Sequence, residues 1–467
     1  MKIALIPIDN RPVCYNLAQE IASIDNDLEL FLPDRAILGG LRSIADIDGI
    51  LNWLANIEDV DAIIVSLDTI AHGGLIPSRR SQDSFNEIKE RLEKFKDKFK
   101  GKVYAFSSIM RISDNNVNEE EKKYWDKFGK QIFEYSYNFH KEGLDKSDVP
   151  EKILTDYLAT RQRNFQINKM YLDWTEEGIF DTLVFSKDDC AQFGLNVLES
   201  EILGRIIKEK NLSALVKTGA DEIPLTLLAR AITDFKSKNM TKPKISTKFL
   251  APEYKDLISN YEDISIEKSV YSQIELAGCE LVNEHEADLI LVVNNFEQNQ
   301  GEIVMNIKTK PFSAELELPQ IPFMVADVRF ANGADKKFVT KLVKKPLDFN
   351  NFYGYSAWNT SANSLGSLIC AAVVRFFAED FNEEAFKKLQ MVRFLDDWAY
   401  QSNVRQGLKG KRETVNGKRN EPRPDVRKLT KLMVPYEKKL QKILGIKSEI
   451  KYKFPWKRFF EIEIGTK

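Results

Sequence analysis

One stretch decides how this chain folds: Thr182-Leu183-Val184-Phe185-Ser186-Lys187-Asp188-Asp189. Its first five residues form an apolar run with the length of a buried strand, and the polar residues after it are typical of a loop. In folds with parallel strands, ligands bind and chemistry takes place at the carboxyl ends of the strands. The stretch therefore predicts an α/β fold in which two carboxyl groups stand at a functional edge.

Asp188 and Asp189 are the catalytic residues that this pattern predicts. Neighbouring carboxylates repel each other, so one of them tends to hold its proton at neutral pH. A protonated and an ionised carboxyl group side by side suit acid/base chemistry on a sugar or a phosphate. The alternative is structural: Asp189 caps a helix that starts near Leu195 or closes an Asx turn, and Asp188 is solvated.

Similar apolar runs recur along the chain and alternate with helical patterns. The eight clearest strand candidates are residues 3–8, 62–66, 103–107, 182–186, 214–217, 289–293, 323–326 and 352–356, and two weaker ones are residues 28–32 and 245–250. This alternation predicts a mainly parallel sheet covered by helices. The number of clear strands matches a (β/α)8-like barrel, and two doubly wound α/β units are the alternative.

Two regions interrupt the alternation. Residues 119–174 form a charged, aromatic-rich helical insertion, and after residue 380 only residues 459–464 resemble a strand. We therefore expect an α/β catalytic domain at residues 1–380 that contains the insertion. A mainly helical C-terminal region at residues 381–467 follows it.

Composition limits the class of protein. Of the 467 residues, 43% are hydrophobic and 30% are charged, which is typical of a globular protein with a large core. The formal net charge of −2 gives no overall field that attracts nucleic acid or an anionic membrane, so we expect neither as a partner. Positive charge is concentrated between Arg405 and Arg458. Such a stretch can hold an anionic partner, but it more often forms a solvated surface.

Cysteine and histidine are scarce in this sequence. The four cysteines are far apart and form no Cys-x-x-Cys pair, which is typical of free thiols in a reducing compartment. Only three histidines occur, which argues against a multi-histidine zinc site and against most Ser/His or Cys/His catalysis. We expect no cofactor and no bound metal, with a magnesium or calcium site of oxygen ligands as the alternative.

The N-terminal sequence indicates a location. The apolar run at residues 1–8 is too short for a signal peptide, and no stretch of the sequence approaches a transmembrane helix. We therefore expect a cytoplasmic protein.

Other predicted strand ends carry polar residues of the same kind. Beside the aspartate pair, Asp188 and Asp189, the candidates for substrate binding are Asp9, Arg11, Asp68, Gly73, Gly74, Arg111, Arg161, Asn164, Asp221, Glu222, Asp327, Trp358 and Asn359. Each alone has a structural alternative, such as a turn, a local ion pair or a helix cap. Because surface acids would scatter along the chain, their concentration at strand ends indicates an enzyme.

The residue types among these candidates suit a sugar. The arginines offer rigid forks of donors, the glycine pair at residues 73–74 lets backbone approach a ligand closely, and Trp358 can stack on a sugar ring. Asp68 and Asp327 can accept hydrogen bonds from hydroxyl groups. Within the insertion, Arg161 and Asn164 share one helix face. We expect this face to roof the pocket, and a solvated face is the alternative.

Taken together, these motifs resemble a known family. They are Pro7-x-Asp9-x-Arg11-Pro12, Ser66-x-Asp68, Gly73-Gly74-Leu75, Ser78-Arg79, Arg161-x-Arg163-Asn164, Asp188-Asp189, Gly219-Ala220-Asp221-Glu222 and Trp358-Asn359-Thr360. Over nearly the whole chain the set is similar to a bacterial family catalogued as domain of unknown function 4127. The resemblance implies a shared fold and a shared site, and it implies no particular activity.

A shorter resemblance is to hexosaminidases related to O-GlcNAcase and hyaluronidase. In those (β/α)8 enzymes an Asp-Asp pair follows a central strand and a Trp-Asn motif follows a later one, an order that Asp188-Asp189 and Trp358-Asn359 reproduce. The resemblance implies that Asp188 orients the 2-acetamido group, whose carbonyl attacks the anomeric carbon, and that Asp189 is the general acid/base. The glycine-rich first-strand motif of that family is replaced here by Asp9-Asn10-Arg11.

These observations lead to a hypothesis about function. We expect a carbohydrate-active hydrolase, a glycosidase that uses the paired carboxylates on a small carbohydrate, with N-acetylhexosaminides as one substrate class. One alternative is a magnesium-dependent phosphoryl or nucleotidyl enzyme, in which the acids hold metal and Arg11, Arg79 and Arg111 clamp phosphate. Another is a sugar-binding protein without catalytic activity.

Overall fold

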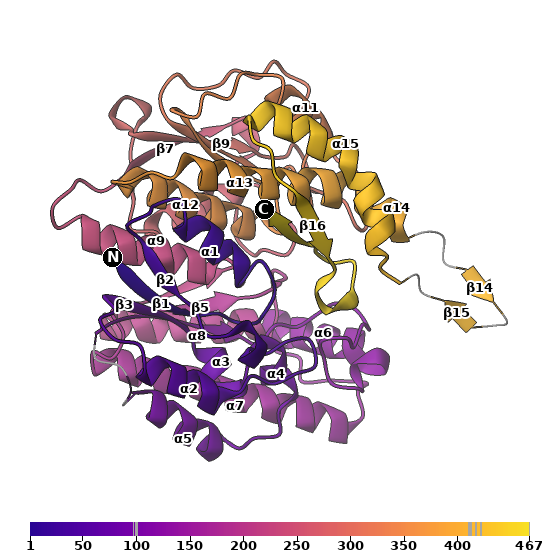
Figure 1. Ribbon diagram of the computed structural model, residues 1–467. Helices are drawn as coiled ribbons and strands as arrows, with labels where there is room; N and C mark the ends of the chain where they lie inside the picture. Colours follow the sequence, from indigo (N-terminus) through magenta and orange to yellow (C-terminus); the bar gives the residue numbers. More distant parts are fainter. Residues whose placement is uncertain (97, 99–100, 410–412, 416–417, 421–422, 467) are drawn as a thin grey trace. The chain divides into compact units, whose positions relative to one another are not determined.

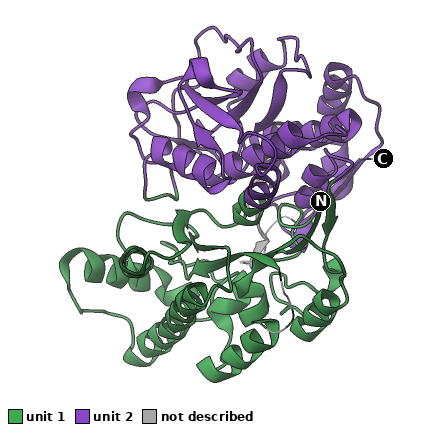
Figure 2. Ribbon diagram, turned by 90° about the vertical axis from the view of Figure 1, so that its left-hand side faces the viewer, with its two compact units in different colours: residues 1–15, 28–227, 261–263 green, residues 16–27, 228–260, 264–467 purple. Residues whose placement is uncertain are grey.

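The computed structural model describes residues 1–96, 98, 101–409, 413–415, 418–420 and 423–466 (Figure 1). The chain forms two compact units (Figure 2). Unit 1 consists of residues 1–15, 28–227 and 261–263, and unit 2 consists of residues 16–27, 228–260 and 264–467. Part of the basic stretch between Arg405 and Arg458 lies outside the described residues, namely residues 410–412, 416–417 and 421–422.

Unit 1 is built on a parallel sheet. Its strands are β1 (Lys2–Ile6), β2 (Glu29–Phe31), β3 (Ala62–Ser66), β4 (Lys102–Ile109), β5 (Thr182–Lys187) and β6 (Ala214–Thr218). They lie in the order β2-β1-β3-β4-β5-β6, and all neighbours are parallel. Because the strand order reverses between β1 and β3, the crevice outside their carboxyl ends is where an open α/β sheet binds ligands.

Helices connect the strands of unit 1. They are α2 (Ile47–Ala55), α3 (Leu67–His72), α4 (Leu75–Arg80), α5 (Phe85–Lys96), α6 (Trp125–Glu142), α7 (Glu151–Glu176) and α8 (Leu195–Lys210). The start of α5 follows from its sequence, because the Glu87 N–H donates to the Ser84 hydroxyl and the Ser84 N–H donates to the Glu87 carboxylate. This reciprocal arrangement satisfies donors that the first turn of a helix leaves open.

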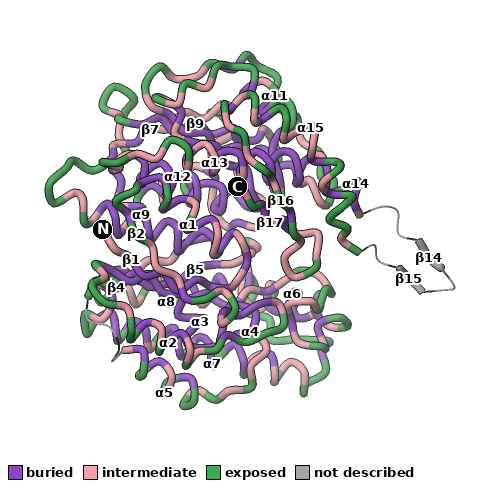
Figure 3. Tube along the Cα trace, in the orientation of Figure 1, coloured by how far each residue is buried: buried purple, intermediate pink, exposed green. Residues whose placement is uncertain are grey.

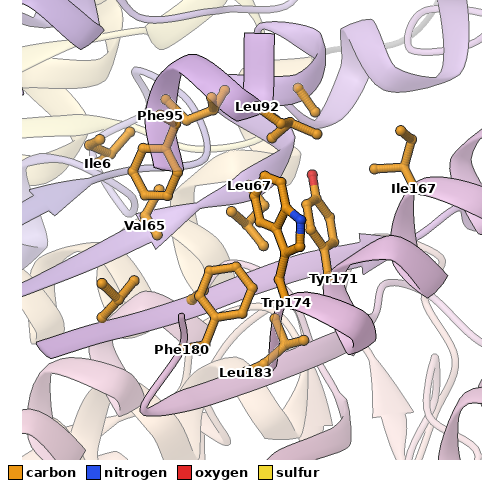
Figure 4. Close-up of a cluster of buried hydrophobic side chains, with 14 of the residues drawn as sticks. Ile6, Val65, Leu67, Leu92, Phe95, Ile167, Tyr171, Trp174, Phe180 and Leu183 are labelled. Atoms are coloured by element: carbon orange, nitrogen blue, oxygen red, sulfur yellow. The ribbon is translucent and has the colours of Figure 1, made fainter. Parts of the chain in front are cut away.

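A hydrophobic cluster joins this sheet to its helices α2, α5 and α7 (Figure 4). Trp174 and Tyr171 of α7 contact Phe180, with ring centroids 6.2 and 6.3 Å from the Phe180 ring. Leu92 of α5 and Val65 of β3 are fully buried. Burial of one such side chain contributes about 1.5–3 kcal/mol. The cluster therefore holds the strands against the helices.

Unit 2 is built on a second parallel sheet. Its strands are β7 (Lys244–Phe249), β8 (Glu280–Leu281), β9 (Leu289–Asn294), β11 (Phe323–Asp327) and β13 (Phe352–Ser356). They lie in the order β13-β11-β9-β7-β8, again with all neighbours parallel. Read in chain order, this is the same arrangement as β1 to β5 of unit 1. Strands β3 and β9, which follow the reversal in each sheet, are buried along their whole length (Figure 3).

The helices of unit 2 include a long irregular one. They are α1 (Asn16–Ala22), α10 (Ile266–Leu276), α11 (Lys336–Leu342), α12 (Ser361–Phe377), α13 (Glu383–Arg393), α14 (Arg405–Lys409) and α15 (Val426–Leu444), and α9 (Ile223–Lys236) contains the division between the units. Between α13 and α14 the chain continues as a π-helix, Phe394–Val404. Such wide turns are rare in proteins.

Short strand pairs complete the described chain. β10 (Gly301–Glu302) pairs with β12 (Phe330–Ala331), β14 (Glu413–Val415) with β15 (Lys418–Asn420), and β16 (Ile450–Lys453) with β17 (Glu463–Thr466). The sequence did not predict β16, because its alternating lysines leave no apolar run. The strand expected at residues 459–464 begins only at Glu463. No helix within the described residues is both long and apolar enough to cross a membrane.

The α/β class is confirmed, but the (β/α)8 barrel is not found. The parallel strands lie in two open sheets, and neither sheet closes within the described part of the chain. A barrel would join the first and last strands, whereas β1 lies between β2 and β3 and β6 pairs only with β5. Strands and helices alternate in the same way in both architectures, so the sequence pattern did not separate them. The alternative of two doubly wound units has the strand order that each sheet shows.

Candidate functional site

The aspartate pair follows β5 directly, at the carboxyl edge of the unit 1 sheet. Asp189 has a φ of 28°, in the left-handed region that an aspartate adopts more readily than most residues. Two contacts hold this loop in place. The Lys187 ammonium pairs with Asp263, and the Cys190 N–H donates to the Tyr261 carbonyl at 3.0 Å. Helix α8 starts at Leu195 without a side-chain cap, so the capping alternative for Asp189 is wrong.

Two arginines contact the pair. Arg111 lies with Nη1 3.0 Å from Asp189 Oδ2 and 3.5 Å from Asp188 Oδ2. Arg79 Nη2 lies 2.7 Å from the same Asp188 oxygen, and the Arg79 side chain is 1% exposed. Asp188 therefore contacts two guanidinium groups, whereas Asp189 contacts one. The Asp189 side chain is also 40% exposed. Asp189 is therefore the more open of the two carboxyl groups.

Two further carboxylates complete the cluster. Glu120 Oε2 lies 2.8 Å from Arg111 Nη2 and 3.5 Å from Arg79 Nη1. Glu121 Oε1 lies 3.4 Å from Arg79 and 3.5 Å from Arg111, and its side chain is 4% exposed. Neither glutamate was predicted as a site residue, because neither follows a strand. The only available signal was the run of acids at residues 119–121, shortly after Arg111.

The electrostatic environment shifts the pKa of Asp189. Burial of the Asp189 carboxyl group is the largest cause that raises its pKa, to about 7, and the negative charge of Asp188 is the second. The positive charges of Arg111 and Arg79 lower the pKa of Asp189. A general acid works best when its pKa is near the working pH, so Asp189 has the property that acid catalysis requires.

A further arginine, Arg11, contacts carboxylates at the same edge of the sheet, after β1. The Arg11 guanidinium donates to both Asp221 oxygens, from Nη2 at 2.6 Å and from Nη1 at 3.1 Å, and its Nε donates to Asp9 at 2.8 Å. All three side chains are less than 10% exposed. Burial raises the pKa of Asp221. The contacts of Asp221 with Arg11 therefore form a buried ion pair within unit 1.

Asp68 stands at the reversal point between β1 and β3. It lies in the first turn of α3, which Ser66 caps by accepting from the Thr69 N–H at 3.3 Å. The Ser108 N–H donates to Asp68 Oδ2 at 2.8 Å, and burial raises the pKa of Asp68 to about 6. Asp9, after β1, and Asp68, after β3, therefore flank the position where such sheets bind ligands.

The glycine pair and Glu222 have local structural roles. Gly73 ends α3 with a φ of 77°, and a Cβ there would lie 2.2 Å from the Ile44 side chain. Gly74 has a φ of 131° and precedes α4. Glu222 Oε2 accepts from the Ala220 N–H at 3.1 Å, and burial raises the Glu222 pKa to about 8.

The polar helix face on α7 is buried and is paired with other parts of unit 1. The Arg161 guanidinium lies 2.7 Å from Glu199 Oε1 on α8 and donates to the Tyr157 hydroxyl at 3.2 Å. Asn164 donates to the Ser78 carbonyl at 3.0 Å. These contacts tie α7 to α8 and α4. The expectation that this face roofs a pocket stays a prediction, whereas the solvated alternative is wrong.

Three candidates belong to unit 2 and are engaged within it. Asp327 accepts from the Asn294 amide at 2.7 Å, the Asp335 N–H at 2.8 Å and the Tyr355 hydroxyl at 3.2 Å, and burial raises its pKa well above the usual range. Trp358 is 3% exposed and meets the Phe460 ring edge-on at 6.0 Å. Asn359 has a φ of 58°, and its carbonyl accepts from the Asn332 N–H at 2.7 Å.

Two cavities lie among the described residues away from the aspartate pair. One cavity of about 390 Å³ in unit 2 is lined in part by Glu20, Asn382 and Lys388, and one of about 810 Å³ in unit 1 lies along α5, α7 and α8. Neither is lined by the predicted site residues. Within the described chain, no group of three or more His, Cys, Asp or Glu side chains is arranged to hold a metal ion.

The family of the chain follows from comparison with known proteins. A family model described as "Protein of unknown function (DUF4127)" matches residues 3–465, so the chain belongs to this family. No curated protein matches the chain.

Proposed function

We propose that this protein is a glycosidase-type hydrolase in which Asp188 and Asp189 act on a glycosidic bond of a small carbohydrate. The observation that carries the proposal is the inequality of the two carboxyl groups. Arg79 and Arg111 both hold Asp188, while Asp189 is more exposed and has a pKa raised to about 7. Pairs of acids that the environment drives apart in this way serve as acid and partner in catalysis.

The proposed reaction begins with proton transfer from Asp189. The proton passes to the glycosidic oxygen as the bond between that oxygen and the anomeric carbon breaks. Water then adds to the anomeric carbon and returns a proton to Asp189, so the enzyme ends as it began. On an N-acetylhexosaminide, Asp188 orients the acetamido group, a role that the hexosaminidase resemblance suggests.

Residues along the same sheet edge support recognition of a sugar. Asp9, Arg11, Asp68 and Asp221 provide acceptors and donors for hydroxyl groups near the reversal point of the sheet. As part of the same proposal the protein works in the cytoplasm, since its four cysteines are free and buried.

An activity screen tests the proposal. Aryl glycosides, including aryl N-acetylhexosaminides, are offered to the purified full chain with and without a chelator. We expect hydrolysis of at least one glycoside that the chelator leaves unchanged. Loss of activity with chelator would instead favour the magnesium-dependent alternative, and sugar binding without turnover would favour the sugar-binding protein.

Two variants make the screen specific to this chain. Asp189→Asn, purified in the same way, is the blank that reveals any contaminating glycosidase. Asp181→Asn is the matched control, because Asp181 precedes the same strand and accepts from the Val103 N–H at 2.9 Å. The proposal requires that the first variant loses about 10²- to 10⁴-fold in turnover and that the second keeps its turnover.

A further inference from the structure

Helix α15 of unit 2 carries a regular pattern of positive charge. Its cations form two groups with identical internal spacing, which are Arg427, Lys428 and Lys431, and then Lys438, Lys439 and Lys442. The second group repeats the first after 11 residues. Since α-helical positions advance by about 100° and 1.5 Å per residue, the two groups lie on one face within an arc of about 120° and about 16 Å apart.

The opposite face of α15 is the one that packs on the protein. Its buried residues, Leu429, Met433, Leu440 and Leu444, have the same 11-residue repeat. The six cations are exposed, and α15 shows exposed positions along its length (Figure 3). The orientation of the charged face is therefore fixed by the apolar anchor, and the face points to solvent.

Acids do not neutralise this face. The only acidic residue within α15 is Glu437, which accepts from the Tyr452 hydroxyl at 2.8 Å, and the Asp425 carboxylate that caps the helix accepts from the backbone N–H groups of Arg427 and Lys428. Within the described part of the chain, none of the six cations forms an ion pair with an acid, and only Lys439 has another partner, the Trp398 ring at 5.0 Å. In a chain with a net charge of −2, this is a local concentration of uncompensated charge.

We propose that this face of α15 is a docking surface for a linear acidic polysaccharide that carries carboxylate groups. Two clusters of positive charge about 16 Å apart fit an extended polymer that carries a carboxylate on its sugar rings, because such a chain presents negative charge to both clusters at once. Between the clusters Pro435 lies on this face, and exposed Leu432 borders it. Each ammonium group acts as a compact point charge toward a carboxylate.

Other polyanions fit the surface less well. Five of the six cations are lysines, which lack the fork that matches phosphate, and the face has no aromatic side chain on which bases stack. The sequence pI of about 6.2 is also far below that of typical nucleic-acid-binding domains. A membrane-surface helix needs a wide apolar face that enters the lipid. The apolar face of α15 is buried against the protein, and only Val426 and Leu432 are exposed large apolar residues of this helix.

Binding of the full chain to immobilised alginate tests the proposal. Affinity is measured at about 0.01 M salt, where charges act over about 30 Å, and again at about 0.1 M, where they act over about 10 Å. We expect binding that weakens with salt, with neutral dextran as the negative probe. The absence of alginate binding at the lower salt concentration would overturn the proposal.

Charge-removal variants locate the surface. Arg427→Gln/Lys428→Gln/Lys431→Gln should weaken alginate binding roughly 10- to 100-fold, since each such contact contributes a factor of several. The matched control removes three exposed cations from and beside α11, Lys336→Gln/Lys337→Gln/Lys344→Gln, and should leave affinity within about twofold. Equal losses in both variants would show a general charge effect and contradict the docking site. Unchanged melting temperatures establish that both variants are folded.

Three competing probes decide the class of partner. Duplex DNA, vesicles with anionic lipid and poly-glutamate are tested at equal charge concentration. Alginate should bind most tightly. A clear preference for any of the other three would overturn the choice of a polysaccharide and assign the surface to that class.

Discussion

The two units share one strand order but differ in what stands at their strand ends. In unit 1, carboxylates and arginines follow β1, β3, β4 and β5, as the Asp9–Arg11 and Asp188–Arg111 contacts show. In unit 2, the position after β7 is closed by the Asn295 side chain, whose amide oxygen and nitrogen bond both backbone groups of Ala251 at 2.9 and 2.8 Å. One sheet topology thus carries different side chains at its strand ends, and the site that we propose lies at the edge of the unit 1 sheet.

Asp327 and Asp189 illustrate this difference between the strand ends of the two units. Both follow a strand and both have a raised pKa. Asp327 accepts three hydrogen bonds from its own unit and is fully buried, whereas Asp189 has one arginine contact and an exposed side. A buried and fully bonded acid stabilises a fold, and a partly open acid is available to a substrate.

The largest effect is expected from Asp189→Asn. Asparagine keeps the shape of the side chain but cannot donate the catalytic proton, so turnover should fall about 10²- to 10⁴-fold. The melting temperature should change little, because the repulsion from Asp188 is also removed. Turnover on the glycoside found in the screen and thermal unfolding are the two measurements. Near-normal turnover would contradict the assignment of Asp189 as the general acid.

Asp327→Ala should have the opposite profile. It leaves the Asn294 amide and the Tyr355 hydroxyl without their acceptor in the core of unit 2, which should lower the free energy of unfolding by about 2–5 kcal/mol. The turnover of the folded fraction should persist. Asp288→Ala is the control, since exposed Asp288 accepts a single hydrogen bond, from the Lys244 N–H, and should cost about 1 kcal/mol or less. Equal losses in the two variants would contradict a special structural role for Asp327.

Arg11→Lys tests the fork at the other end of the unit 1 edge. Lysine cannot bond both Asp221 oxygens and Asp9 at once, so the free energy of unfolding should fall by about 1–3 kcal/mol. Arg91→Lys changes the partly exposed pair with Asp83 and should cost less than about 1 kcal/mol. Denaturant unfolding compares the two. A larger loss from Arg91→Lys would show that the buried fork does not stabilise unit 1.

The smallest effect is a pH dependence that both units share. Asp189 and Asp396 have pKa values raised to about 7, and Asp68 and Asp397 to about 6. A carboxyl group whose pKa is raised on folding contributes stability below its unfolded pKa of about 4 and loses it as pH rises through the folded value. The melting temperature should therefore fall between about pH 4 and pH 8.

The Asp189→Asn variant isolates one part of this dependence. The fall in melting temperature with pH should be shallower in the variant than in the parent chain. Because 40% of the Asp189 side chain is exposed, solvent screening keeps the difference small. A steeper fall in the variant would contradict the raised pKa.

Much of the local structure could be predicted from the sequence. The runs at residues 62–66 and 352–356 are strands with those bounds, and the run at residues 182–186 is a strand one residue longer. Continuous apolar runs are strong signals because both faces of a central parallel strand are buried. The same reasoning predicted that Asp188 and Asp189 stand directly after a strand.

Tertiary structure alone decided which strands pair. The short edge strands β2 and β8 have partly or fully exposed residues, and each keeps its sheet open by occupying the position where a barrel would close. Strand order depends on contacts between residues far apart in the chain, and no local pattern encodes them. The two hexosaminidase-like motifs, expected along one barrel, therefore belong to two sheets.

The sequence by itself determined the chemistry available to this protein, which is a pair of acids with arginines at strand ends. Only the tertiary structure decided how those groups combine. It brings Glu120 and Glu121 into contact with Arg79 and Arg111. It pairs Arg161 with Glu199, and it places Asp188 and Asp189 in different environments. Residue type fixes which charges a chain carries, while burial and long-range pairing fix their pKa values and partners.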